Sequence, residues 1–201
     1  IFALQPKHID KVLESVLSKI SDKHIVVSVA AGVEIPRIED IIGNDKNIIR
    51  VMPNTAISIG KSMTCIAANE KAQDKVVLAQ DIFNLLGTTL VIPEDLIQAA
   101  TVICASGIAF WMRLVRATTQ GAIQLGFEAH EAHELATQTC FGAASLLIES
   151  GRHPEQEIDR VTTPSGCTIE GLNAMEHQGL SSALIQGIVA SFEKINQLKK
   201  N

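Results

Sequence analysis

Tyrosine is absent from the 201 residues, and aromatic side chains make up only 3% of them. A chain with so few aromatic rings lacks the stacking platforms on which proteins usually hold single-stranded nucleic acids. Positive charge is also scarce, because the net charge is -5 and no basic block occurs along the chain. Both features argue against nucleic acid as a partner.

Paired cysteines, a leader pattern and a long apolar run are missing too. The four cysteines form no CxxC pair and lie far apart at positions 65, 104, 140 and 167, which is typical of reduced thiols in a cytoplasmic protein. The chain does not begin with a signal-peptide pattern, and no apolar run is long enough to cross a bilayer. We therefore expect a cytoplasmic protein without a membrane partner.

A glycine-rich phosphate loop is also absent, since no G-x-G-x-x-G occurs among the 201 residues. The chain begins without a methionine. Its first residues, Ile1-Phe2-Ala3-Leu4, form an apolar run that is typical of the middle of a strand. We expect further sequence to precede Ile1 in the natural protein.

Up to Ile92 the chain alternates between strand and helix patterns. Hydrophobic residues make up 46% of the whole chain, which is enough for a sizeable core. Apolar, β-branched runs such as 24–30 and 48–52 suit strands that are buried on both faces of a parallel sheet. The predicted strands are 1–4, 24–30, 48–52, 62–68 and 88–92, and the predicted helices between them are 9–20, 36–42 and 70–86. Such alternation predicts a parallel α/β layer.

Beyond Ile92 no convincing strand pattern occurs. The predicted helices are 96–104, 108–125, 128–150, a short helix to 177 and 181–198, and Ala105-Ser106-Gly107 is expected to interrupt the first two. The sequence thus predicts an α/β domain at 1–92 followed by an all-helical domain at 93–201. The helices are apolar and rich in alanine, so we expect them to bury surface against a second subunit. A monomeric helical bundle is the alternative.

The stretch from Val161 to Leu172 is the strongest candidate for a ligand site. A small-residue loop turns at Gly166 and runs into a helix, whose first amides lack partners and carry partial positive charge. Such a loop can hold a carboxylate or phosphate. The alternative is an ordinary helix start with Thr168 as its N-cap. Covalent catalysis by Ser165 or Cys167 is disfavoured, because no histidine is placed to activate either of them.

A second candidate is the edge where three predicted strands end. These ends are Ala3-Leu4-Gln5-Pro6, Val29-Ala30-Ala31-Gly32 and Met52-Pro53-Asn54-Thr55. In open α/β sheets ligands lie across the carboxyl ends of the strands, so the three ends could form the rim of a dinucleotide crevice. The histidines of His130-Glu131-Ala132-His133 are spaced too closely for a zinc-protease helix and favour an exposed polar face.

Five stretches, in order along the chain, resemble the pattern of the pyrroline-5-carboxylate reductase family. The resemblance extends over essentially the whole chain, and the stretches that carry it are Ala3-Leu4-Gln5-Pro6 (family A-V-K-P), Val29-Ala30-Ala31-Gly32-Val33 (A-A-G-V), Arg50-Val51-Met52-Pro53-Asn54-Thr55 (R-x-M-P-N-T), Cys104-Ala105-Ser106-Gly107-Ile108-Ala109-Phe110 (S-G-S-G-P-A-Y) and the stretch from Val161 to Leu172 (S-P-G-G-T-T-I-x-G-L).

This resemblance implies an N-terminal Rossmann domain for NADP or NAD, of which the first part lies before Ile1, and a C-terminal helical dimerisation domain. It implies reduction of 1-pyrroline-5-carboxylate to L-proline, the last step of proline biosynthesis, by a homodimer or higher homo-oligomer. A related imine or β-hydroxyacid reductase is an alternative, and so is a truncated, inactive oligomerisation module.

The resemblance also implies roles for particular residues. Thr168 is the implied catalytic residue, since its hydroxyl can bond the ring nitrogen of the substrate. The implied substrate-binding residues are Glu94, Ser106, Gly107, Gly166, Cys167 and Thr168. The implied cofactor-binding residues are Ala3, Leu4, Gln5, Pro6, Ala30, Ala31, Gly32, Asn54 and Arg160, and no metal is implied. The chain departs from the family at Gln5, Ile108, Phe110, Ser165 and Cys167, which bears on substrate affinity more than on the class of reaction.

Overall fold

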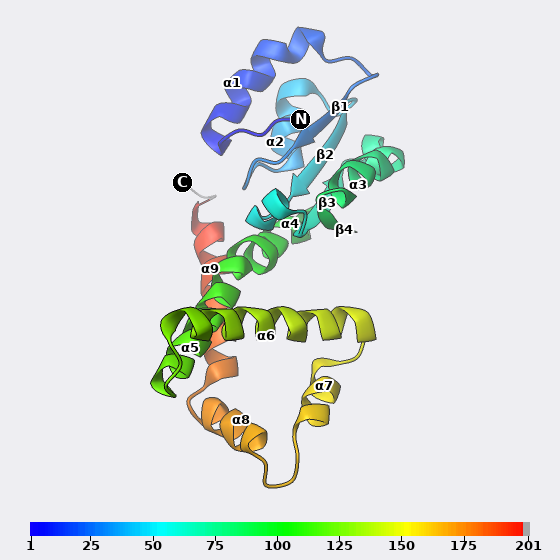
Figure 1. Ribbon diagram of the computed structural model, residues 1–201. Helices are drawn as coiled ribbons and strands as arrows, with labels where there is room; N and C mark the ends of the chain where they lie inside the picture. The colour runs from blue at the N-terminus through cyan, green and yellow to red at the C-terminus, as the bar shows by residue number, and fades with distance from the viewer. Residues whose placement is uncertain (199–201) are drawn as a thin grey trace. The chain divides into compact units, whose positions relative to one another are not determined.

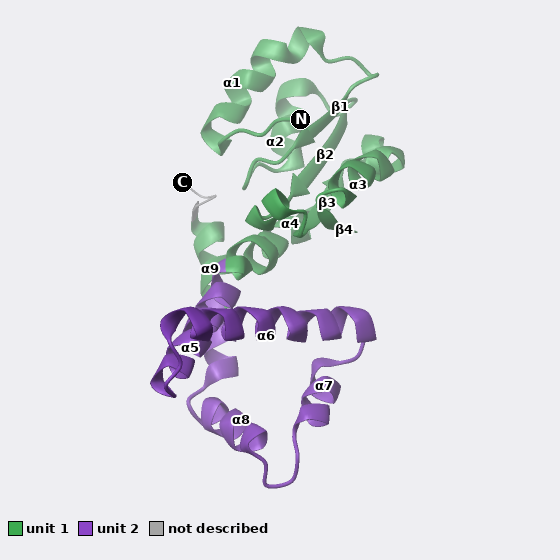
Figure 2. Ribbon diagram, viewed as in Figure 1, with its two compact units in different colours: residues 1–108, 188–201 green, residues 109–187 purple. Residues whose placement is uncertain are grey.

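The computed structural model describes residues 1–198 and divides into two compact units. One unit comprises residues 1–108 together with the chain from 188 onward, and the other comprises 109–187 (Figure 2). Each unit is described on its own. The predicted domain boundary between 92 and 93 stays a prediction, and the last residues of the predicted second domain lie outside the described part of the chain.

A four-stranded sheet forms the centre of the first unit (Figure 1). Its strands, β1 (Ile25–Ser28), β2 (Asn47–Met52), β3 (Ser62–Ala68) and β4 (Gly87–Val91), lie in the order β1-β2-β3-β4. Phe2 adds a single parallel bridge to Ser28, where the sequence had predicted a strand over residues 1–4. The other four strands lie close to their predicted positions, because each is a short β-branched run bounded by turn residues.

The sequence predicted a parallel sheet, but the observed sheet is mixed. The pairs β1–β2 and β3–β4 are parallel, but β2 and β3 are antiparallel, with Met52 opposite Cys65. A parallel pair needs a crossover connection of about a dozen residues or more, usually with a helix. The connection from β2 to β3 holds only a short 3₁₀ turn (Thr55–Ile59), so the chain reverses direction there.

Helices cover both faces of this sheet, with α1 and α3 on opposite sides (Figure 1). On one face, α1 (Pro6–Val16), α2 (Ile35–Ile42) and α4 (Ile97–Ala100) enclose a core that includes Val26, Ile48 and Met52. On the other face, a 3₁₀ segment (Glu70–Lys75) and α3 (Val76–Asn84) pack on Val27, Ile49, Val51 and Ile66. Successive strand residues alternate between the two cores, as the pleat requires.

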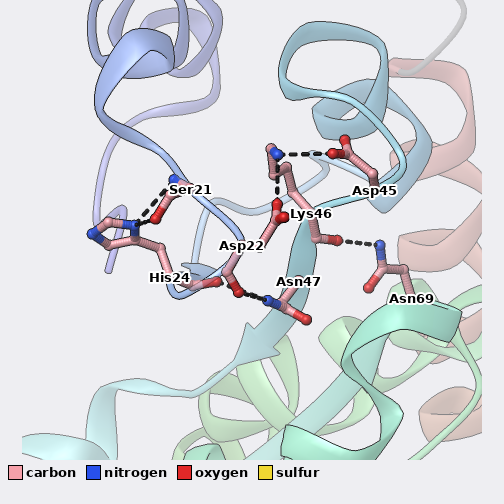
Figure 3. A network of polar contacts seen from close by, with 7 residues as sticks. All are labelled: Ser21, Asp22, His24, Asp45, Lys46, Asn47 and Asn69. Carbon is pink, nitrogen blue, oxygen red and sulfur yellow. Dashed lines mark hydrogen bonds and ion pairs between the residues drawn. The ribbon is translucent and has the colours of Figure 1, made fainter.

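Polar side chains close the end of the sheet at which β1 and β2 begin (Figure 3). The ammonium of Lys46 lies 2.8 Å from carboxylate oxygens of both Asp22 and Asp45, and these hydrogen bonds raise the pKa of Lys46. The buried Asn47 donates to the backbone oxygens of Asp22 and His24, and Asn69 donates to that of Lys46. This end of the sheet is therefore occupied by structural contacts.

The chain then forms one continuous helical stretch from Glu94 to Gln124. It contains a 3₁₀ turn (Glu94–Leu96), α4, a π-helical turn (Thr101–Ser106) and α5 (Gly107–Gln124). The predicted interruption at Ala105-Ser106-Gly107 is thus wrong, because the small residues are accommodated by widening the helix rather than by ending it. Short π-helical segments are rare and frequently occur at functional sites.

By length and composition this stretch could cross a bilayer, with a mean hydropathy of 1.5 in its most apolar window. The expectation that no segment is long enough is therefore wrong by that criterion. A single such helix is weak evidence for a membrane, because apolar helices of soluble proteins pass the same test.

The second unit is all-helical. After α5 it contains α6 (Ala129–Ser150), α7 (Pro154–Val161), α8 (Cys167–His177) and the first part of α9 (Leu180–Leu198). The sequence did not predict α7, although His153 and Gln156 form a capping box at its start and Pro154 takes the first helical position.

Few side chains are buried in this second unit. Among its residues only Thr119, Ala132 and Ala136 are buried. Large apolar side chains are instead exposed along every helix, including Trp111, Met112, Ile123, Leu125, Phe127, Leu135, Phe141, Leu146, Ile148, Val161, Ile169, Met175, Leu180 and Ile185. The unit thus leaves much of its apolar surface uncovered within one chain.

Candidate functional site

Three of the predicted cofactor segments follow parallel strand ends in the first unit. Ala3 to Pro6 follows the Phe2 bridge, Ala30 to Gly32 follows β1, and Asn54 follows β2. Since Phe2, β1 and β2 run parallel and are neighbours, the structure brings these segments to one edge of the sheet. The geometry of the predicted edge is confirmed, while the binding role of each residue stays a prediction.

Small residues keep this edge open near the end of β1. The backbone N–H of Ala30 donates to the hydroxyl of Ser28 at 3.3 Å, which fixes the turn out of the strand. Gly32 has a φ of 75°, a left-handed conformation that favours glycine, and a Cβ built there would meet no atom within 4 Å. A planar group could therefore approach the backbone closely here.

Asn54 is buried and uses both ends of its side chain for structural contacts. Its oxygen accepts the N–H of Ala56 at 3.0 Å and caps the 3₁₀ turn after β2. Its Nδ2 donates to the backbone oxygen of Cys104 at 3.0 Å, and its own N–H donates to the Ser62 hydroxyl. Asn54 thus links the end of β2 to the π-helical turn, and this link was not expected from the sequence.

The predicted substrate residues Ser106 and Gly107 lie where the π-helical turn meets α5. Both belong to the continuous helix, where the sequence had predicted an interruption. The turn is held on one side by Asn54 through Cys104, so its position depends on the same strand end that carries the predicted cofactor residues. The structure therefore brings Ser106 and Gly107 to the same unit as Asn54.

Sequence analysis missed a thiol pair at this turn. Cys104 packs against the core to which Cys65 of β3 belongs, and the two thiols are hydrogen-bonded. The hydrogen bond from Cys65 lowers the pKa of Cys104 to about 7 against the opposing effect of burial. It raises the pKa of Cys65, and burial acts in the same direction. Nothing in the spacing of the two cysteines could have revealed the contact.

Glu94 is engaged by two groups of the first unit. Its Oε1 accepts a hydrogen bond from Arg50 at 2.8 Å and one from the backbone N–H of Ile35 at 3.0 Å. The Arg50 side chain is only 2% exposed, and its Nε and the Glu94 Oε2 are buried without a partner among the described residues. The visible role of Glu94 is to neutralise Arg50 and to hold the start of α2. An arginine inside the apolar strand 47–52 was the signal in the sequence.

A cleft of about 470 Å³ opens beside Glu94, between α2 and the chain that follows β3. Its charged lining residues are mostly acidic, with carboxylates of Glu39, Glu70 and Glu94 and the ammonium of Lys71. None of the predicted cofactor residues lines this cleft. It therefore does not unite Glu94 with the open edge of the sheet.

The predicted substrate loop lies in the second unit, before α8. The N–H of Gly166 donates to the Thr163 oxygen at 2.9 Å, so the loop closes tightly on itself. A Cβ at Gly166 would lie 2.4 Å from the Thr163 hydroxyl and 2.9 Å from its backbone oxygen, so no other residue fits. Ser165 adopts a left-handed φ of 56°, which is strained for a residue with a side chain.

The first amides of α8 are open to a ligand. Gly166 is the N-cap, and across residues 1–198 no side chain caps this helix. The alternative in which Thr168 is the N-cap is therefore wrong, because Thr168 is the second residue of the helix, two residues after the N-cap. Cys167 and Thr168 are both exposed at this start, where the helix carries partial positive charge.

Arg160, a predicted cofactor residue, lies on α7 in the same unit. Its guanidinium is 60% exposed and forms an ion pair of 2.8 Å with Glu157, one turn away on the same helix. The predicted site residues thus fall into two groups, one in each unit. The arrangement of one group against the other stays a prediction.

Comparison with known proteins agrees with these features. A family model described as pyrroline-5-carboxylate reductase dimerisation matches residues 94–198. The chain is 45% identical to pyrroline-5-carboxylate reductase 1 of Dictyostelium discoideum over 98% of its length, but spans only 38% of that relative. It superposes on a pyrroline-5-carboxylate reductase from Coxiella burnetii with a TM-score of 0.93 at 31% identity, covering 98% of this chain and 74% of that one. A Plasmodium falciparum pyrroline carboxylate reductase with NADP bound gives a TM-score of 0.88 at 24% identity, covering 98% and 79%.

Proposed function

Because the chain belongs to the pyrroline-5-carboxylate reductase family, we propose that it acts in the reduction of 1-pyrroline-5-carboxylate to L-proline with NADPH or NADH, the last step of proline biosynthesis. The reduced nicotinamide, when bound, supplies the hydride for the imine carbon. The protein supplies position, charge and a proton. The start of α8, with its uncapped amides behind Gly166, is the observation that carries this proposal.

The amides of Cys167 and Thr168 hold the substrate carboxylate, since unpartnered N–H groups and the helix dipole both favour an anion there. The Thr168 hydroxyl donates a hydrogen bond to the ring nitrogen and passes on a proton from water. Its exposure lets water reach it. We further propose that Glu94, Ser106 and Gly107 of the first unit contribute to substrate binding, Glu94 through the contacts that it makes with Arg50 and Ile35.

The proposed cofactor residues fit a nicotinamide and its ribose at the open edge of the sheet. The exposed small residues Ala31 and Gly32 leave room for a flat ring against the backbone, the buried Ala30 anchors this segment to the core, and Ala3 to Pro6 border the ring on the other side. Asn54 fixes the shape of this edge, and Arg160 offers an exposed positive charge. We expect the 201-residue chain to bind free cofactor weakly, because the chain contains no G-x-G-x-x-G phosphate loop.

We also propose that the chain works as a homodimer or larger homo-oligomer in the cytoplasm, with residues 1–92 as the cofactor domain and 93–201 as the dimerisation domain. The exposed apolar side chains of α5, α6 and α8 support a partner surface. The description of the matching family model supports the same assembly.

The decisive experiment measures oxidation of NADPH and NADH by the natural chain with 1-pyrroline-5-carboxylate, beside other cyclic imines and β-hydroxyacids. We expect proline as the product and the highest kcat/KM for 1-pyrroline-5-carboxylate. Preference for another imine or a hydroxyacid identifies a related reductase. If the protein binds neither cofactor nor substrate, the remaining interpretation is an inactive oligomerisation module.

Thr168→Ala tests the proposed proton donor. It should lower kcat by about tenfold or more, since one lost hydrogen bond is worth roughly 1.4 kcal/mol. Thr168→Ser keeps a hydroxyl and should retain most of the activity. Equal kcat in all three proteins would remove Thr168 from the mechanism.

A further inference from the structure

Two of the four cysteines are neighbours in the first unit. Cys65 lies in the middle of β3 and is 2% exposed, and Cys104 lies in the π-helical turn and is half-buried against the same core. Their thiols are hydrogen-bonded to each other. Cys140 and Cys167 belong to the second unit, on α6 and at the start of α8.

The backbone around this pair is held from two sides. Cys65 is opposite Met52 in the antiparallel ladder, and two residues beyond Met52 the Asn54 side chain donates to the Cys104 oxygen at 3.0 Å. The Asn54 N–H in turn donates to the Ser62 hydroxyl on β3 at 3.1 Å. Asn54 thus ties the π-helical turn at Cys104 to β3 at Ser62, three residues before Cys65, so the proximity of the two segments does not depend on the cysteine side chains alone.

The two thiols are also unequal. Cys65 donates its proton toward the Cys104 sulfur, which stabilises the thiolate of Cys104 and lowers its pKa to about 7. The thiolate is the reactive form toward oxidants and disulfides. Cys104 is the more exposed of the two, whereas Cys65 is buried and keeps its proton.

We propose that Cys104 and Cys65 form an oxidation site, at which hydrogen peroxide converts the two thiols into an intramolecular disulfide. The Cys104 sulfur attacks one peroxide oxygen, the O–O bond breaks, and the departing hydroxide takes up a proton to become water. Cys104 is then a sulfenic acid. The Cys65 sulfur attacks the Cys104 sulfur, the S–O bond breaks, and water leaves with the Cys65 proton. Two thiols and one peroxide thus give one disulfide and two waters.

This disulfide would lock the π-helical turn to β3. Ser106 lies two residues after Cys104, so oxidation should alter turnover as well, and a reducing agent should restore it. Only this last consequence rests on the proposed function. The oxidation site itself can be tested without any activity.

The test treats the reduced protein with hydrogen peroxide, alkylates the remaining thiols in denaturant, and identifies disulfide-linked peptides by mass spectrometry. We expect the Cys65–Cys104 linkage in most molecules, its loss in Cys104→Ala and Cys65→Ala, and its persistence in Cys140→Ala as the matched control. In Cys65→Ala the sulfenic acid cannot be resolved, so dimedone should label Cys104.

The wild-type protein alone can overturn the proposal. Cys104 remaining reduced while exposed Cys167 oxidises would refute it, and so would linkage of Cys104 to another cysteine or to a second chain. Dimedone labelling of Cys65 instead of Cys104 would refute the assigned order of the two steps.

Discussion

The two units of this chain bury their apolar side chains very differently. The first unit packs a sheet between two helical layers and encloses two separate cores, in which residues such as Ile48 and Ile66 are fully buried. The second unit buries only Thr119, Ala132 and Ala136, although its helices carry many large apolar side chains. The first unit therefore has a buried core like that of an independent domain, whereas the second exposes apolar surface of the kind that packs against a partner subunit.

The largest expected effect concerns the buried ion pair of the first unit. Glu94→Ala leaves the Arg50 guanidinium buried and unpaired, which should destabilise this unit by about 3 kcal/mol. Urea denaturation at several protein concentrations measures the free energy of unfolding. The loss of stability should not depend on the protein concentration. Glu14→Ala, at an exposed position of α1, is the control and should change the stability little. A concentration-dependent loss would show that the first unit also relies on a partner.

A smaller effect is expected at the proposed interface of the second unit. Phe141 on α6 is 60% exposed, so Phe141→Glu should leave the fold intact but weaken self-association. We expect the dissociation constant to rise about 30-fold or more, as for loss of a buried aromatic contact worth about 2 kcal/mol. Sedimentation equilibrium measures it, with Leu17→Glu in the first unit as the matched control. If both substitutions weakened self-association equally, the second unit would not be the specific interface that we propose.

A third prediction concerns the reactivity of Cys104 in the well-packed first unit. Cys104 shares a hydrogen bond with Cys65, so its alkylation should reach half its maximal rate near pH 7, because the pKa of Cys104 is lowered to about 7. In Cys65→Ala burial acts unopposed, so the pKa should rise to roughly 8.5 or above, and alkylation at neutral pH should slow about tenfold. Rates of iodoacetamide labelling at Cys104 across pH test this. An unchanged midpoint in the variant would contradict the role given to Cys65.

The smallest effect is expected in the loop of the second unit. Ser165→Gly relieves a left-handed backbone conformation and should stabilise the protein by up to about 1 kcal/mol, partly offset by the greater freedom of glycine when unfolded. Thermal unfolding measures it. Ser145→Gly within α6 is the matched control and should destabilise instead, since glycine is unfavourable inside a helix. Destabilisation by both substitutions would mean that Ser165 makes a needed contact.

Local patterns predicted most of the elements. The run from Ile48 to Met52 is β-branched and ends at a proline, so β2 was predicted almost to its limits. The reversal at β3 was not, because direction depends on the length of a connection whose 3₁₀ turn has no apolar periodicity. The missed α7 depends on a histidine cap, which is an unusual start signal.

The candidate site was predicted unevenly for a similar reason. Strand ends such as Ala30 to Gly32 could be identified because parallel neighbours finish at a common edge. The contacts of Asn54 with Cys104, of Arg50 with Glu94 and of Cys65 with Cys104 join residues far apart in the chain. Tertiary packing creates them, and no spacing within a single sequence encodes them.

The tight closure at Gly166 limits how the proposed substrate loop could be redesigned. Even one added methyl group would collide with Thr163, so libraries that vary this position should yield almost no folded loops. Cys167, whose side chain is exposed at the start of α8, offers a neighbouring position that can be varied without that collision. A directed-evolution campaign should therefore diversify Cys167 and leave Gly166 untouched.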